Sequence, residues 1–267
     1  MLLAATRELC RRRSVILGYH GVGSSPPAQD PHNHRIPAPV FRTQVELLRD
    51  AGYRFVTVAE LAERAAGGPP PAGLAALSFD DGMEDNHSIV LPMLTEYGIP
   101  ATAYVITGLI GRDNPWVPGT RMMTETQLRE LLAGGFEIGA HTVTHPDLSR
   151  LDQAQCLREM VESRGALEDL TAQPVRTFAY PECRYGQAAL AGAAAAGFSA
   201  AVTCEGRGSW RPLEMKRALI TARDGPVAFF LKLTDRYQGL FDSAAGRTLR
   251  WGTRAPRRLL ARPPRRG

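Results

Sequence analysis

The chain has 267 residues, of which 44% are hydrophobic and 22% charged, and this globular composition excludes wholesale disorder. A chain of this length can bury a hydrophobic core without stabilisation by disulfides or metal ions. It suits one large α/β domain or two small ones. The net charge of +5 is uneven, because the eight arginines from Arg247 onward come with no acidic residue. The sequence therefore predicts a near-neutral domain over residues 1–242 and a basic, disordered tail over residues 243–267.

Strand and helix patterns alternate along the chain, with a Pro-rich loop near the start and a capping box at the third helix. This alternation predicts a parallel sheet of βαβ units, and about seven or eight units favour a closed or nearly closed barrel. In chain order the expected elements are strand 14–19, loop 23–39, helix 41–51, strand 53–58, strand 74–79, helix 84–97, strand 101–106, helix 124–133, strand 136–140, helix 152–170, strand 175–179, helix 187–196, strand 198–202, strand 215–220 and helix 226–235.

Two features of the sequence bear on where the protein resides. It has no stretch of about 18 apolar residues, the length needed to cross a bilayer. The opening segment Met1–Ala5 is too short for the apolar core of a signal peptide, so a cytoplasmic location is expected.

The cysteines form no Cys-x-x-Cys pair, and their spacing predicts reduced thiols instead of a disulfide framework or zinc finger. They are Cys10, Cys156, Cys183 and Cys204.

Two polar motifs follow predicted strands, at the edge where a parallel barrel collects its catalytic groups. Asp80 and Asp81 come directly after the third strand, and His141 and His145 follow the fifth. Either motif alone is also typical of a solvated turn. Together, two imidazoles four residues apart and the carboxylate of Asp81 make a ligand set for one divalent ion, with open positions typical of a catalytic metal site.

These motifs resemble those of the polysaccharide deacetylases of the NodB-homology type, a carbohydrate esterase family with a deformed (β/α) barrel of seven or eight units. The resemblance extends over roughly residues 14–235. It implies a metal-dependent hydrolase that removes the acetyl group from an N-acetylated sugar unit. The segments that carry it are SFDDG at 78–82 with the following MEDN, PATAYV at 100–105, EIGAHTVTHPDL at 137–148 and FAYP at 178–181.

The resemblance also implies a role for each site residue. Asp80 is the general base, and an activated water is the nucleophile. The metal ligands are Asp81, His141 and His145, with Zn²⁺ as the first choice of ion and Co²⁺ or Ni²⁺ as alternatives. The backbone N–H of Tyr180 is placed at the developing oxyanion.

The chain departs from the family pattern at two positions. Where the third motif usually has an arginine that orients the base, this chain has Ala179; Arg217 is the first candidate to replace it and Arg176 the second, and either could instead be a surface arginine. The usual C-terminal histidine acid is also missing, because no histidine follows His145. His20 ends the first strand and is similar to the N-terminal Tyr-His of the biofilm-polysaccharide branch. It is therefore expected to protonate the leaving amine, with a structural histidine as the alternative.

Other substrates and functions stay open. The same site would suit deacetylation or deformylation of a small cytoplasmic, lipid-linked or natural-product amino sugar, and a barrel that binds a glycan without hydrolysing it is a further alternative. Trp116 precedes the metal histidines and could stack on a sugar ring or pack at the rim. The tail has no nucleic-acid-binding signature, so no nucleic-acid partner is expected. Weak attraction to the inner membrane face is expected at most, at ~1 kcal/mol per basic residue. The sequence contains no signal for an oligomeric state.

Overall fold

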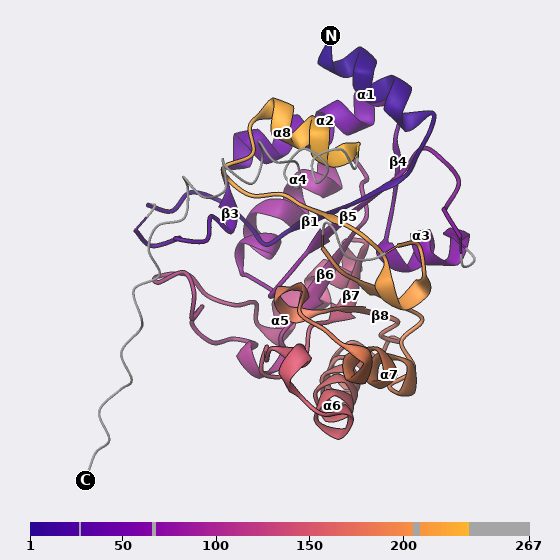
Figure 1. The fold of residues 1–267 in the computed structure, drawn as a ribbon. Coiled ribbons are helices and arrows are strands. Elements are labelled where there is room, and N and C mark those ends of the chain that lie inside the picture. Colours follow the sequence, from indigo (N-terminus) through magenta and orange to yellow (C-terminus); the bar gives the residue numbers. More distant parts are fainter. Residues whose placement is uncertain (27, 66–67, 205–208, 235–267) are drawn as a thin grey trace, which may run out of the picture.

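The computed structural model describes residues 1–26, 28–65, 68–204 and 209–234 (Figure 1). The predicted domain boundary at residue 242 and the predicted tail over residues 243–267 lie outside these residues. Within the described part of the chain, no helix combines the length and the apolar character needed to cross a bilayer.

A parallel sheet of eight strands forms the centre of the molecule. Its strands follow the order β10-β1-β5-β6-β7-β8-β9, and the short β4 pairs with the first half of β5. A separate pair, β2 (Gly21–Val22) and β3 (Arg35–Ile36), lies outside this sheet. The strands of the main sheet are β1 (Val15–Tyr19), β4 (Arg54–Val56), β5 (Leu74–Phe79), β6 (Ala101–Val105), β7 (Phe136–Ala140), β8 (Thr177–Ala179), β9 (Ala200–Val202) and β10 (Ala218–Leu219).

The sheet curls because the segment that contains one edge strand, β10, also contacts the other edge strand, β9. We call residues 215–220 the closing segment. At its start, Met215 donates its N–H to the carbonyl of Ala201 in β9 at 2.8 Å. At its end, Ile220 donates its N–H to the carbonyl of Gly18 in β1 at 2.8 Å. The predicted deformed (β/α) barrel is confirmed, and β1 and β9 meet through this segment.

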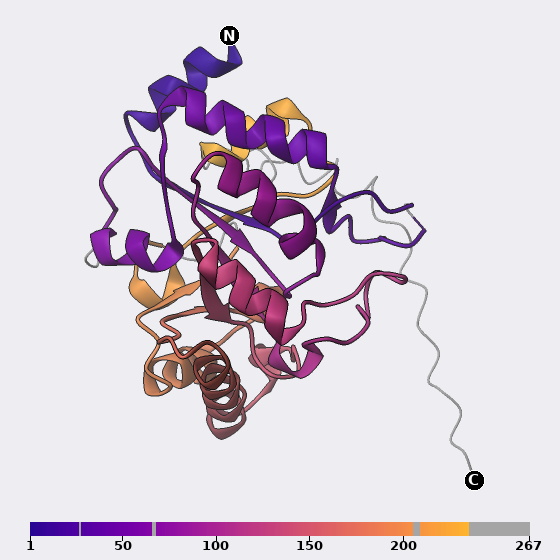
Figure 2. The same cartoon turned by 180° about the vertical axis from the view of Figure 1, so that it is seen from behind.

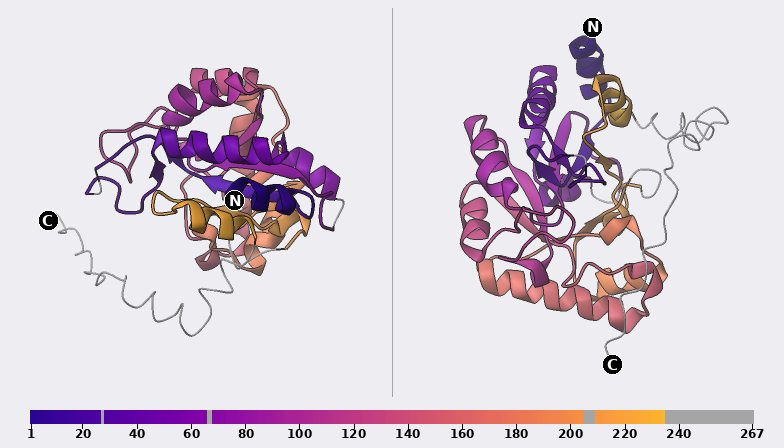
Figure 3. Two further views of the ribbon diagram at one scale, coloured as in Figure 1. Left: turned by 90° about the horizontal axis from the view of Figure 1, so that it is seen from above. Right: turned by 90° about the vertical axis from the view of Figure 1, so that its left-hand side faces the viewer.

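Helices cover the outside of the barrel. In Figure 2, α2, α4, α5 and α6 follow one another along one face, and Figure 3 shows α1 beside α8 near the N-terminus. The helices are α1 (Leu2–Cys10), α2 (Ala38–Ala51), α3 (Val58–Ala65), α4 (Leu91–Glu96), α5 (Glu125–Ala133), α6 (Gln153–Thr171), α7 (Gln187–Ala195) and α8 (Pro226–Leu233). Short turns of helix add η1 (Asn86–Val90), η2 (Thr107–Leu109), η3 (Leu148–Arg150), η4 (Pro181–Cys183) and η5 (Pro212–Glu214).

The predicted elements match the structure where local signals are strong. The predicted strand over 74–79 coincides with β5, and Thr124 caps α5 through the expected box with Gln127. The sequence analysis missed α1 and α3. For α3 the reason is visible: the predicted strand over 53–58 runs into the start of that helix, and eight residues give little room for a periodic pattern.

The core lies on both faces of the sheet, as a parallel sheet covered by helices requires. All six residues of β5 are buried. Toward the helices, Tyr19, Phe41 and Phe79 pack with ring centroids 5.2 to 5.8 Å apart. Inside the barrel, Tyr104 belongs to a second cluster of aliphatic side chains that includes the small residues Ala76, Ala179 and Ala200. This rigid frame fixes the strand ends from which the site is built.

Candidate active site

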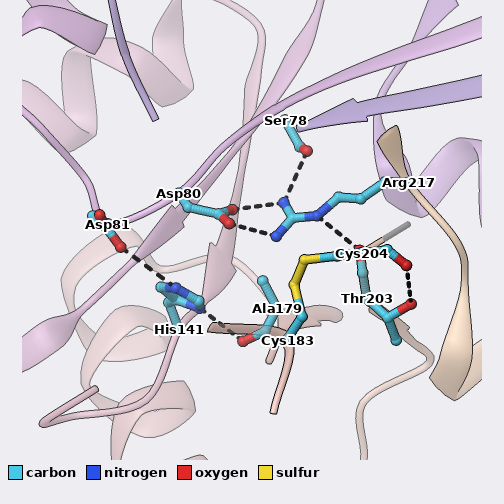
Figure 4. Close-up of a disulfide and its surroundings, with 9 residues drawn as sticks. All are labelled: Ser78, Asp80, Asp81, His141, Ala179, Cys183, Thr203, Cys204 and Arg217. Atoms are coloured by element: carbon cyan, nitrogen blue, oxygen red, sulfur yellow. Dashed lines mark hydrogen bonds and ion pairs between the residues drawn. A yellow bond between two sulfur atoms is a disulfide. The ribbon is translucent and has the colours of Figure 1, made fainter. Parts of the chain in front are cut away.

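The acid pair lies at the carboxyl end of β5. Asp80 still belongs to the sheet pattern, since its N–H donates to the carbonyl of Tyr19 at 2.9 Å. The chain then turns sharply, with Asp81 at φ 72° and Gly82 at φ 83°. This left-handed turn, which glycine adopts readily and aspartate tolerates, sends the two buried carboxylates in different directions. Asp80 points toward Arg217 of the closing segment, and Asp81 points toward His141 (Figure 4).

The two histidines flank a tight turn after β7. His141 continues the sheet and donates its N–H to the carbonyl of Val105 at 3.1 Å. Thr142 and His145 both have positive φ, 67° and 58°, so the chain reverses within four residues. The Thr142 hydroxyl oxygen accepts the N–H of His145 at 3.0 Å. The two rings therefore converge, with centroids 5.0 Å apart.

Asp81, His141 and His145 come together as the sequence predicts. One Oδ of Asp81 lies 3.5 Å from Nε2 of His141 and 3.7 Å from Nε2 of His145. One ligand atom from each residue lies within 4.8 Å of the others, so a single ion can reach all three. The same Asp81 oxygen is buried and accepts no hydrogen bond from the described residues. A buried carboxylate oxygen left in this way is suited to a cation.

A backbone carbonyl fixes the ring of His141. Its Nδ1 lies 2.7 Å from the carbonyl oxygen of Ala179, which can only accept a hydrogen bond, so Nδ1 carries the proton (Figure 4). In the neutral imidazole this leaves the lone pair on Nε2, the nitrogen that faces Asp81. Metal-binding histidines are typically held in this way. The residues present therefore fit a divalent ion.

The charges of the three groups are strongly coupled. Burial alone would raise the pKa of Asp81, but the close His141 ring and the charges of His20 and His145 lower it below its ordinary value. Burial lowers the pKa of His145 to about 4, helped by the charge of His141. The pKa of His141 is raised, because the nearby carboxylates of Asp81 and Asp80 and the carbonyl of Ala179 together outweigh the effect of burial. The centre thus keeps a negative carboxylate and a neutral His145 near neutral pH.

Arg217 pairs with Asp80 inside the barrel. Nη1 donates to one carboxylate oxygen of Asp80 at 2.6 Å, and Nη2 donates to the other. Nη1 also donates to Ser78 Oγ at 3.1 Å, and Nε donates to the carbonyl of Thr203 at 3.1 Å (Figure 4). Burial would raise the pKa of Asp80, but the charge and hydrogen bonds of Arg217, together with the charges of His141 and His20, outweigh it and keep the pKa below its ordinary value. The second candidate, Arg176, is exposed and pairs with Glu63 at 3.1 Å.

His20 follows β1 and lies near the acid pair, since its charge is among those that lower the pKa of both Asp80 and Asp81. Its ring stacks on that of His34, with centroids 4.4 Å apart and planes tilted by 6°. Its carbonyl accepts the side-chain N–H of Asn86 at 2.9 Å. The Pro-rich loop that carries His34 is thereby brought against the site, which the sequence did not indicate.

Both the backbone N–H and the hydroxyl of Tyr180 have hydrogen-bond partners. Its N–H donates to the carbonyl of Val202 at 3.3 Å, because the pairing of β8 with β9 continues for one more residue. Its hydroxyl donates to the carbonyl of Leu213 at 3.0 Å. The N–H is therefore paired in this structure, and the expected role of Tyr180 at the oxyanion stays a prediction.

The expectation of four reduced thiols is also wrong, because Cys183 and Cys204 form a disulfide (Figure 4). They follow β8 and β9, which are parallel neighbours, so the segments after these strands lie side by side. Their Cα atoms are 5.7 Å apart, within the range for a disulfide. Cys183 lies four residues after Ala179, whose carbonyl bonds to His141, and Cys204 directly follows Thr203, whose carbonyl bonds to Arg217. The disulfide therefore links the two segments that hold these side chains. Cys10 and Cys156 are buried free thiols.

Trp116 lies at the rim of the metal centre. Its ring contacts that of His145, with centroids 5.0 Å apart and planes tilted by 62°. The side chain is half-buried. This contact agrees with rim packing, and the partly open ring keeps one edge of the metal centre apolar.

Comparisons with known proteins agree with this arrangement. A profile of the polysaccharide deacetylase family matches residues 67–201, half of the chain. The Bacillus subtilis protein YxkH is 30% identical over 191 residues, 71% of this chain and 64% of that protein. The poly-β-1,6-N-acetyl-D-glucosamine N-deacetylase of Staphylococcus aureus is 26% identical over 158 residues, 56% of this chain and 54% of that enzyme. The chain thus spans less than two thirds of the length of these curated relatives.

Two solved structures share the fold over most of this chain. The Streptococcus pyogenes deacetylase PplD, solved with acetate, superposes with a TM-score of 0.72 at 28% identity, covering 83% of this chain and 98% of that one. IcaB from Ammonifex degensii superposes with a TM-score of 0.68 at 25% identity, covering 83% of this chain and 97% of that one.

Proposed function

The chain belongs to the polysaccharide deacetylase family, and from this premise we propose that it removes the N-acetyl group from an amino-sugar unit of a glycan by metal-dependent hydrolysis. One observation carries the proposal. The ligand set of Asp81, His141 and His145 lies next to a second carboxylate, Asp80, which is kept ionised by Arg217. A site that only bound a glycan would need neither the ligand set nor the paired base.

The ligand set prepares the reaction. When bound there, a divalent ion, with Zn²⁺ the first choice, would polarise the acetyl carbonyl and lower the pKa of a water molecule. The negative charge of Asp81 and the two imidazoles suit such an ion. The carbonyl of Ala179 keeps the proton of His141 on Nδ1, away from the ion.

Asp80 acts as the general base. Its carboxylate takes the proton of the attacking water as the carbon–oxygen bond forms. Arg217 binds both carboxylate oxygens, which fixes the plane of the group, and each oxygen keeps a further lone pair to accept that proton. In this proposal Arg217 takes the part that the family's third motif usually gives to an arginine at the position of Ala179.

His20 acts as the general acid. Collapse of the tetrahedral intermediate breaks the carbon–nitrogen bond, and the leaving amine needs a proton that His20 donates. Its position after β1, close to the acid pair, supports this role. The stacked ring of His34 holds the His20 ring in one orientation.

The first substrate to test is a short β-1,6-linked oligomer of N-acetylglucosamine, since the Staphylococcus aureus relative is an N-deacetylase of poly-β-1,6-N-acetyl-D-glucosamine. Acetate release by the Zn²⁺-loaded wild type, and its loss in Asp80→Asn, is the expected result. Formate release from a formylated amino sugar, with no acetate from acetylated ones, would favour the deformylase alternative. No turnover of either class by metal-loaded protein would contradict the proposal.

A cytoplasmic location was expected from the sequence, and reduced thiols would agree with it. Disulfides persist in oxidising compartments, so the Cys183–Cys204 bond weighs against that location. The cytoplasm, with weak contact to the membrane face through the tail, stays a prediction that cell fractionation would test.

A further inference from the structure

The turn between the two metal histidines is held from outside by one carboxylate. Glu159 lies in α6 and is half-buried. Its Oε2 accepts the N–H of Val143 at 2.8 Å and the N–H of Thr144 at 3.0 Å. Its Oε1 accepts the hydroxyl of Thr144 at 2.6 Å. Three donors of the turn His141–His145 thus converge on a side chain 15 residues further along the chain.

The conformation of this turn needs support. Thr142 and His145 occupy the left-handed region, which costs free energy for residues with a β-carbon, above all for the β-branched threonine. Such a conformation persists only where the surroundings determine it. The position of the His145 ring depends on this backbone conformation, because His145 is the last residue of the turn.

The carbonyl side of the turn is held by a different segment. The N–H of Thr107 donates to the carbonyl of Thr142 at 3.2 Å, and the N–H of Gly108 donates to the carbonyl of Val143 at 3.0 Å. A β-carbon at position 108 would lie 2.4 Å from that carbonyl oxygen, so the close approach requires glycine. The η2 segment therefore bonds to two backbone carbonyls of the turn, and Glu159 bonds to two of its N–H groups and to the Thr144 hydroxyl.

We propose that Glu159 is a positioning residue of the metal centre, which sets the distance between His141 and His145 by holding the turn that joins them. The proposal rests on the proposed function, because it assumes that these histidines bind the ion. Glu159 itself lies outside the ligand set. It acts through the backbone of Val143 and Thr144, and its charge strengthens those hydrogen bonds.

The test is the metal affinity of variants at position 159. Glu159→Ala removes all three acceptors, and we expect its affinity for Zn²⁺ and Co²⁺ to fall at least about 10-fold, as for other groups that orient metal ligands. Glu159→Gln removes the charge but keeps a carbonyl oxygen for the two N–H groups, and its affinity should stay within about 3-fold of the wild type. Glu162→Ala and Glu162→Gln are matched controls on the exposed face of α6, with no expected change.

Dissociation constants would be measured by competition with a chelating dye, beside the visible spectrum of the Co²⁺-loaded protein and the Tm of the metal-free protein. A lower affinity and an altered Co²⁺ spectrum in Glu159→Ala, with the metal-free Tm close to that of the wild type, support the proposal. Should Glu159→Ala fail to fold, Glu159→Asp, whose shorter side chain cannot reach all three donors, decides by the same criterion.

Two results would overturn the inference. One is an affinity of Glu159→Ala equal to that of the wild type. The other is an equal loss in Glu159→Ala and Glu159→Gln, which would mean that the charge alone matters. A wild type that binds no ion is a different outcome, because it contradicts the proposed function itself.

Discussion

The two halves of the candidate site come from different parts of the barrel. The ligand set lies on β5 and β7, strands of the middle of the sheet, and each ligand belongs to a short local motif. Arg217, the partner of the base, comes from the closing segment. His20, the proposed acid, directly follows β1. The metal half is thus a local feature of the chain, and the other half exists only where the sheet closes on itself.

This difference separates two classes of variant. Changes in the metal half should remove the ion and with it every later step. Changes near the closing segment should leave the ion in place and lower turnover or stability. Metal content and acetate release, measured on the same samples, distinguish the two classes.

The largest effect near the closing segment is expected for Asp80→Asn. Loss of the general base should lower kcat by up to about 10⁴-fold, while the ion stays bound. The amide has nearly the shape of the carboxylate but cannot take the proton of the water. Elemental analysis beside an acetate assay measures both quantities. Turnover close to that of the wild type would contradict the role of Asp80.

Arg217→Gln should destabilise the fold by about 3–5 kcal/mol, because it leaves a buried carboxylate without its counter-ion. The pKa of Asp80 is depressed in the folded protein, so the pair stabilises the fold above the unfolded value, near pH 4, and this contribution is lost as the pH falls through the folded pKa. The difference between wild type and variant, measured by urea unfolding, should therefore be largest at neutral pH and shrink below about pH 4. Arg217→Lys keeps the charge but not the bidentate hydrogen bonding, and it should lose less stability than Arg217→Gln. Equal stability of wild type and Arg217→Gln at neutral pH would contradict a contribution of the Asp80–Arg217 pair to the stability of the fold.

Cys183→Ser should cost about 3 kcal/mol, the value expected for a bond that closes a loop of this length, here 21 residues apart in sequence. The ion should remain, since none of the ligands lies in that loop. Unfolding with and without a thiol reductant checks this, because the reductant should destabilise the wild type and leave the variant unchanged. A wild type insensitive to reductant under unfolding conditions would contradict the disulfide.

The smallest effect is expected for His20→Gln, with a fall of about 10²-fold in kcat on the N-acetyl substrate. An activated acetate ester leaves without needing a proton, so its hydrolysis should fall much less. The ratio of the two rates is the measurement. A similar loss on both substrates would mean that His20 orients the site without acting as an acid.

The metal half could be predicted from the sequence and the other half only in part. Asp81, His141 and His145 follow strands with clear apolar patterns, so both their chemistry and their shared edge could be inferred. Arg217 was one of two candidates, because only the path of the closing segment decides which arginine points inward.

Other features depend on pairings that the sequence does not encode locally. The bond from the N–H of Tyr180 to the carbonyl of Val202 extends the pairing of β8 with β9 by one residue, which the sequence did not indicate. The Cys183–Cys204 bond joins two strand ends that are distant in sequence and adjacent only in the sheet. The hydrogen bonds from the turn between the two histidines to Glu159 likewise depend on how α6 packs beside β7.

The most direct test of the account is the metal content of the wild type beside His141→Ala, after loading with Zn²⁺ and removal of free ion. The account predicts about one ion per wild-type chain, as a single three-ligand site requires, and its loss in the variant. It also predicts that acetate release disappears together with the ion. A wild type without bound metal, or a His141→Ala variant that keeps its ion and its turnover, would contradict the central claim.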